Sequence, residues 1–146
     1  MKIIYLISVL FLASFQLTYT QSKQNIDSLL NVYNKSNIDS IKLKTSNRIV
    51  AYYLYRDVNK AKYYALKQLQ LGDKLNDITG KKKANHQLSI IYNSIDKYDS
   101  AKYYIEKTIK LSEITKDLSQ QSLSRHSLVI LEISKGTTLP SLFLIC

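Results

Sequence analysis

The sequence predicts an all-α protein, a short α-solenoid of antiparallel helix pairs, and two observations lead to this prediction. Residues 52–78 and 92–118 resemble each other at a fixed offset of forty, with matches such as Tyr64 and Tyr104. Apolar residues also recur three and four positions apart, and 146 residues include only one Pro and three Gly. Self-similarity at one offset is typical of repeat arrays, in which each unit buries its apolar face against its neighbour.

Residues 1–20 have the features of an export signal. Lys2 supplies a positive start, residues 3–12 form an apolar run, and small polar residues precede Gln21. We therefore predict a cleaved signal peptide and an exported protein, periplasmic or secreted. The alternative is an uncleaved anchor over residues 3–19, at the short limit for a membrane span. Only in that form do we expect attachment to a membrane.

Residues 21–37 are predicted to form a polar lead and one short helix. Ile26, Leu29, Leu30 and Tyr33 follow the spacing of a single helical face. A break over residues 35–37 then separates this helix from the array.

Residues 38–134 are predicted to form the array, two full helix pairs plus the first helix of a third. In the second helix of each pair one stripe should be buried: Val58, Ala61, Ala65, Leu69 and Gly72, then Tyr98, Ala101, Ile105, Ile109 and Ser112. Gly72 marks either a close helix crossing or early fraying of the helix.

Lys81 to Lys83 lie near the start of the next helix, where the helix dipole disfavours positive charge. One interpretation starts the helix earlier, at Thr79, and leaves the lysines solvated. The other is a contact with an anion or an acidic peptide.

Residues 135–146 are predicted to be an irregular apolar tail, because Pro140 disfavours a helix there. Two interpretations stay open. Either the tail folds back onto the last helix, or the chain is a truncated or frame-shifted copy of a longer protein.

The array resembles the tetratricopeptide repeat family. The residues that carry the resemblance are Leu88, Ser89, Tyr92, Ala101 and Tyr104 in one copy, and Tyr52, Ala61 and Tyr64 in the other. The period is forty rather than the 34 of that family, and longer helices would absorb the difference. The resemblance implies that these positions pack the repeats. Exported arrays of this Tyr- and Lys-rich kind are similar to the periplasmic portions of sensor kinases and regulators.

The resemblance also implies a binding face, because the first helices of such repeats line a concave side. The residues expected on it are Ser46, Val50, Tyr53, Lys83, His86, Ile90, Asn93, His126 and Ile130. This stripe contains no carboxylate, so it suits a protein or peptide partner with an acidic or carboxylate end. The alternative is that the groove is merely solvated and the partner surface lies elsewhere.

Composition argues against several other functions. The net charge is +10, but the lysines are spread over the chain, which favours a solvated surface over a nucleic-acid site. His86 and His126 are equivalent, yet no Cys or carboxylate recurs with them to complete a metal site. Neither a catalytic constellation nor a phosphate-binding loop is visible. We therefore expect no enzyme activity, cofactor or metal.

The leading hypothesis is an exported interaction scaffold that binds a partner protein or peptide. The alternative is the severed sensory portion of a periplasmic signalling protein, a histidine kinase or a transcriptional regulator.

Overall fold

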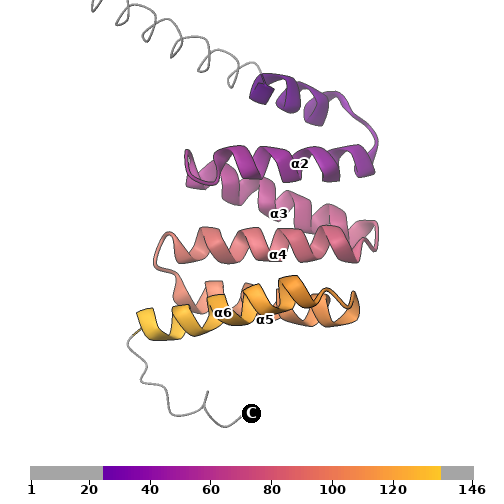
Figure 1. Ribbon diagram of the computed structural model, residues 1–146. Helices are drawn as coiled ribbons and strands as arrows, with labels where there is room; N and C mark the ends of the chain where they lie inside the picture. The colour runs from indigo at the N-terminus through magenta and orange to yellow at the C-terminus, as the bar shows by residue number, and fades with distance from the viewer. Residues whose placement is uncertain (1–24, 136–146) are drawn as a thin grey trace, which may run out of the picture.

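Helices make up almost all of the chain that the computed structural model describes, residues 25–135 (Figure 1). A short helix covers residues 25–35. It is followed by α2 (Asp39–Tyr53), α3 (Val58–Lys74), α4 (Ile78–Asn93), α5 (Tyr98–Ile114) and α6 (Leu118–Ser134). No strand occurs within residues 25–135, which confirms the all-α prediction. The expected signal peptide, residues 1–20, and the tail beyond Lys135 lie outside the described residues.

Aspartate side chains begin three of these helices. The residue before α3, α4 and α6 is Asp57, Asp77 or Asp117, and each carboxylate accepts a hydrogen bond at 3.0 Å from the backbone N–H three residues later. A cap of this kind stabilises a helix by about 1 kcal/mol. The cap at Asp77 starts α4 at Ile78, one residue before the start that the sequence suggested.

The helices form a short α-solenoid, as predicted. Successive helices pack side by side, so that α2, α4 and α6 lie on one side of the stack and α3 and α5 on the other (Figure 1). α3 begins at Val58 and α5 at Tyr98, so the sequence offset of forty is also the structural repeat. α2 and α4 touch directly as well, which joins the first helices of successive pairs.

The main core lies where α2, α3 and α4 meet. It consists of the fully buried side chains of Val50, Ala61, Ala65, Leu88 and Ile91. The two alanines belong to α3, and their small side chains let the backbones of the neighbouring helices approach closely. Because each neighbour covers a different side of α3, the stripe stabilises two helix contacts at once.

A second core cluster lies between α5 and its neighbours, built from Ala101, Ile105 and Leu131. Tyr92 of α4 packs against it and stacks on Tyr104, with ring centroids 5.4 Å apart. The first pair of helices also has a stacked pair of tyrosines, but its member from the first helix is Tyr53, one residue after the position equivalent to Tyr92.

Tyr53 and Tyr64 stack with centroids 6.4 Å apart, and Tyr52 lies edge-on to Tyr53 at 5.1 Å. All three rings are half-buried. Stacked and edge-on pairs add about 0.5–1.5 kcal/mol beyond the area they bury. The tyrosines therefore align the first and second helices of each pair.

The buried stripe of the second helices differs from the prediction at two positions in each helix. Val58 and Tyr98, at the start of the stripe, are half-buried. Gln68 and Thr108 are buried where Leu69 and Ile109 were expected, and the latter two are half-buried. The hydroxyl of Thr108 donates to the backbone carbonyl four residues earlier, at 2.9 Å. The Gln68 carbonyl oxygen has no hydrogen-bond partner. The helix crossings therefore contain buried polar side chains, whereas periodicity alone predicted that the apolar residue at the next position would be buried.

The three lysines at the start of α4 are not all solvated, which corrects one of the two interpretations. Lys82 is only 7 % exposed, and its ammonium lies 2.6 Å from Asp117 and 3.0 Å from the Thr115 hydroxyl. Lys81 lies 3.5 Å from Asp73. Of the run, only Lys83 is left exposed.

Gly72 marks a close crossing of α3 and α4 rather than fraying. A Cβ atom there would lie 2.9 Å from Cγ and 3.1 Å from the backbone nitrogen of Lys81. A side chain at this position would therefore push the two helices apart.

Candidate functional site

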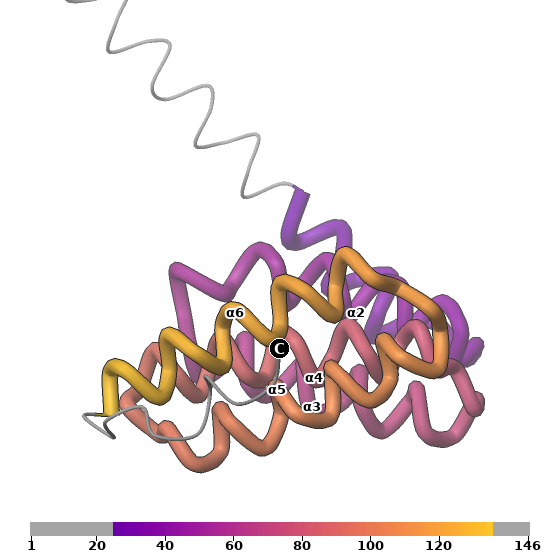
Figure 2. Tube along the Cα trace, turned by 60° about the horizontal axis from the view of Figure 1, so that its bottom comes forward, coloured from indigo at the N-terminus to yellow at the C-terminus, as the bar shows by residue number. Residues whose placement is uncertain are grey.

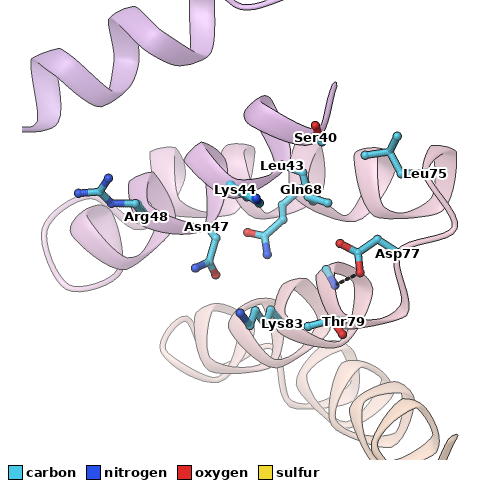
Figure 3. Close-up of a pocket in the computed structure, with 11 residues that line it drawn as sticks. Ser40, Leu43, Lys44, Asn47, Arg48, Gln68, Leu75, Asp77, Thr79 and Lys83 are labelled. Carbon is cyan, nitrogen blue, oxygen red and sulfur yellow. Dashed lines mark hydrogen bonds between the residues drawn. The ribbon is translucent and has the colours of Figure 1, made fainter. Parts of the chain in front are cut away.

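A hollow with a volume of about 580 Å³ opens between α2 and α4, with α3 beneath it (Figure 3). Its lining comes from all three helices and from the turn before α4. The lining residues are Ser40, Leu43, Lys44, Asn47, Arg48, Gln68, Leu75, Asp77, Thr79, Gly80 and Lys83. The hollow lies on the side of the stack that the first helices form.

Gln68 lies at the bottom of this hollow and is 1 % exposed. Figure 3 shows its amide pointing from α3 into the space between α2 and α4. The carbonyl oxygen Oε1 is buried without a hydrogen-bond partner. An unsatisfied buried acceptor costs about 1–3 kcal/mol, so a ligand that donates an N–H or O–H here would recover that cost.

Three cations surround the hollow: Lys44 and Arg48 on α2, and Lys83 on α4. Among residues 25–135, none of the three forms an ion pair with a carboxylate. Figure 3 shows Arg48 extending outward at one end. The lining includes one carboxylate, Asp77, which is engaged in capping α4. The lining residues therefore carry a net positive charge that favours an anionic group.

A side-chain contact fixes the spacing of α2 and α4 beside the hollow. Gln87 Nε2 donates to Asn47 Oδ1 at 3.1 Å and to the Asn47 backbone carbonyl at 3.4 Å. These residues occupy equivalent positions, forty apart. Gln87 Oε1 is also buried without a partner. The contact holds Asn47 toward α4, where Figure 3 shows it pointing.

Two residues expected on the binding face are not available to a partner. Ser46 and Val50 are fully buried, which corrects the prediction for both. Val50 belongs to the core cluster with Leu88 and Ile91, because α4 packs over this face of α2. Tyr53, half-buried, stacks on Tyr64 and serves mainly to pack the pair.

The expected residues on α4 are accessible. Lys83 is exposed in the large hollow. Ile90 and Asn93 line a second hollow of about 100 Å³ that α4 shares with α5 and α6. His86 is half-buried between these two places, and burial lowers the pKa of its imidazole below 6.5.

On α6, His126 and Ile130 are both exposed. The structure does not gather the nine expected residues into one surface, because only Lys83 reaches the large hollow. Within residues 25–135, no three His, Cys, Asp or Glu side chains converge in a way that could hold a metal ion.

Sequence reasoning missed four important lining residues: Lys44, Asn47, Arg48 and Gln68. The first three follow Ser40 along one side of α2, a polar run that could have been noticed. Gln68 lies at the helical spacing of Ala61, Ala65 and Gly72, so a buried position was available to it. A polar side chain at that spacing indicates a buried polar position, but an analysis that follows only the periodicity of apolar residues does not detect it.

Among residues 25–135, no helix combines the length and apolar character that a membrane span requires. No family model matches the chain, and comparison with curated proteins finds no match. The likeness to tetratricopeptide repeats therefore rests on the residues quoted above and stays a prediction.

Proposed function

We propose that the protein is a non-enzymatic interaction scaffold, of tetratricopeptide type and exported, which binds an acidic, extended segment of a partner protein. The proposed binding site is the hollow between α2 and α4. Export rests on the sequence of residues 1–20, and the repeat type rests on the resemblance.

The observation that carries this proposal is that one hollow combines cations and a buried acceptor that have no partner among residues 25–135. Lys44 and Lys83 supply positive charge from opposite helices, and Gln68 supplies a buried carbonyl oxygen without a donor. A peptide segment carries both complementary groups, because its backbone N–H donates and its acidic side chains or carboxyl end accept. Hydrogen bonds between charged groups are about twice as strong as neutral ones.

The shape of the hollow supports a peptide. Leu43 and Leu75 provide apolar lining beside the polar groups. Ligand sites typically combine such apolar walls with a few convergent polar groups, in volumes of about 300–1,000 Å³. The volume of about 580 Å³ lies within that range and would take a few residues of an extended chain.

The test is calorimetric titration with two pools of octapeptides that have random interiors. One pool ends in Asp-Glu with a free carboxylate, and the matched pool ends in Asn-Gln with an amide. We expect the acidic pool to bind more tightly, and the double substitution Lys44→Gln plus Lys83→Gln to reduce its affinity at least tenfold. The preference should weaken with added salt.

Lys110→Gln is the matched control, because Lys110 is an exposed lysine on α5, away from the hollow. It should leave the affinity unchanged. Equal binding of the two pools, or an acidic pool that binds the double variant as well as it binds the wild type, would rule out this site. Circular dichroism checks that each variant stays helical.

A further inference from the structure

The last helix presents an apolar stripe that none of the described residues covers. Leu123, Ile130 and Ile133 of α6 are 58 %, 49 % and 57 % exposed. They are spaced seven and three residues apart and so share one helical face. Figure 2, which brings the α6 end of the stack forward, shows α6 as the terminal helix.

The equivalent face of α2 shows what such a stripe normally does. Leu43 and Val50 both lie eighty positions, two repeats, before Leu123 and Ile130 respectively, and they are 6 % and 0 % exposed. They are buried because α3 and α4 both pack against α2 there, with Val50 in the core cluster and Leu43 beside Gly80. The apolar stripe on α6 therefore has the composition of a packing face, but no helix among residues 25–135 packs over it.

We propose that the chain's own C-terminal segment, residues 139–146, packs onto the stripe formed by Leu123, Ile130 and Ile133. This segment reads Leu-Pro-Ser-Leu-Phe-Leu-Ile-Cys, with five large apolar side chains and no charged one. Burying such a segment lowers the free energy by roughly 25 cal/mol per Å² of apolar surface that is removed from water. The stripe offers it an apolar surface of matching chemistry.

The reach of the segment is sufficient. Eleven residues follow Lys135, and at ~3.3 Å per residue an extended chain of that length spans about 36 Å. The seventeen residues of α6 rise about 26 Å. A salt bridge between Lys135 and Asp99 of α5 fixes the point at which the chain leaves α6. From there an extended segment can run back along the whole helix.

The short tether favours this occupant over a second molecule. A segment joined by a few residues has an effective concentration near its site of about millimolar, well above the concentration of another copy in dilute solution. Pro140 removes a backbone donor and disfavours a helix, so the segment is suited to pack as an extended strand of chain. It would then cover the apolar face that α6 exposes among the described residues.

Cys146 provides the test, because it is the only cysteine in the sequence. A nitroxide attached to Cys146 in the purified, ¹⁵N-labelled protein should broaden the amide signals of the first half of α6, around Leu123. The amide signals of α3 should be unaffected. The matched control carries the same nitroxide with Leu142→Asp and Phe143→Asp, and there the α6 signals should regain their intensity while the rest of the spectrum stays the same.

Three results would overturn the proposal. One is the absence of broadening in α6. The second is broadening that persists in the double Asp variant. The third is broadening of α6 that persists when nitroxide-labelled ¹⁴N protein is mixed with ¹⁵N protein that has no nitroxide, because it would assign the stripe to a second copy of the chain.

Discussion

Lys82 connects two successive repeats through a single buried ammonium. Its side chain is 9 % exposed and leaves α4 to meet Asp117, the capping residue of α6, at 2.6 Å. It also donates to the Thr115 hydroxyl at the end of α5. One lysine therefore ties α4 to the turn between α5 and α6, so that the cap, the turn and the neighbouring repeat are held together.

Replacement of Lys82 by Met should destabilise the protein by about 2 kcal/mol, the typical value of a hydrogen bond to a charged group. The aliphatic part of the side chain is preserved, so the loss should reflect the ammonium. Urea denaturation at pH 7 measures it. Lys83→Met is the matched control: Lys83 is exposed, and its replacement should change the free energy of unfolding by less than about 0.5 kcal/mol.

The same substitution should have a pH-dependent effect. The hydrogen bond from Lys82 is the main cause that lowers the pKa of Asp117 below 3.8. A carboxyl with a lowered folded-state pKa stabilises the fold above the unfolded value, and this stability is lost as the pH falls through the folded value. The difference between wild type and Lys82→Met should therefore shrink below pH 3.8. A difference that stays constant there would contradict the role of Asp117.

At the scale of helices, the crossing of α3 and α4 depends on a glycine. Gly72→Ala should gain about 1 kcal/mol of helix propensity. A Cβ would, however, lie 3.1 Å from the backbone nitrogen of Lys81, and overpacking of this kind costs about 1–3 kcal/mol. We expect a net loss of stability of about 1 kcal/mol, measured by thermal unfolding.

Ser112→Ala is the control for this crossing, because Ser112 is the equivalent residue of α5, forty positions later. It is fully buried, and its hydroxyl donates only to the Thr108 carbonyl of its own helix. Its replacement should change stability much less than that of Gly72. If Gly72→Ala instead stabilises the protein, the crossing is looser than the structure has it.

Helix positions could be predicted from the sequence, whereas the burial of equivalent residues could not. The aspartate at position 57 begins its helix as local capping chemistry dictates. Ser46 and His86 are equivalent in the repeat, yet Ser46 is fully buried and His86 is half-buried. Capping is decided within four residues of chain, but burial depends on which helix lies over each face. Periodicity treats every repeat alike and cannot supply that information.

The candidate site was predicted only in part, for a related reason. Lys83 was identified because it follows the spacing of the first helices. Gln68 was not identified, because a polar residue inside an apolar stripe is normally assigned to the solvent. Its position at the bottom of the hollow follows from the packing of α2 and α4 over α3.

At the scale of the whole molecule, stability should be highest in the middle of the stack. In a solenoid each repeat contacts only the neighbouring repeats, so the terminal elements have fewer contacts to lose before they open. α4 packs against α3 and α5 and also touches α2, and it includes three fully buried apolar residues, Ala84, Leu88 and Ile91. α6 packs against α5 and has a single buried apolar residue, Leu131.

Native-state amide hydrogen exchange should therefore be slowest in α4 and faster toward both ends, in residues 25–35 and in α6. Amides in the centre should exchange only by the largest opening of the structure, and those at the ends by local opening of single helices. Leu88 of α4 and Ile130 of α6 form a direct comparison. Their positions within their helices differ by only two residues, but Leu88 is fully buried and Ile130 is exposed. Equal protection of these two amides, with one common dependence on denaturant, would show that the described helices unfold as one cooperative unit, and it would contradict the independence of the terminal repeats.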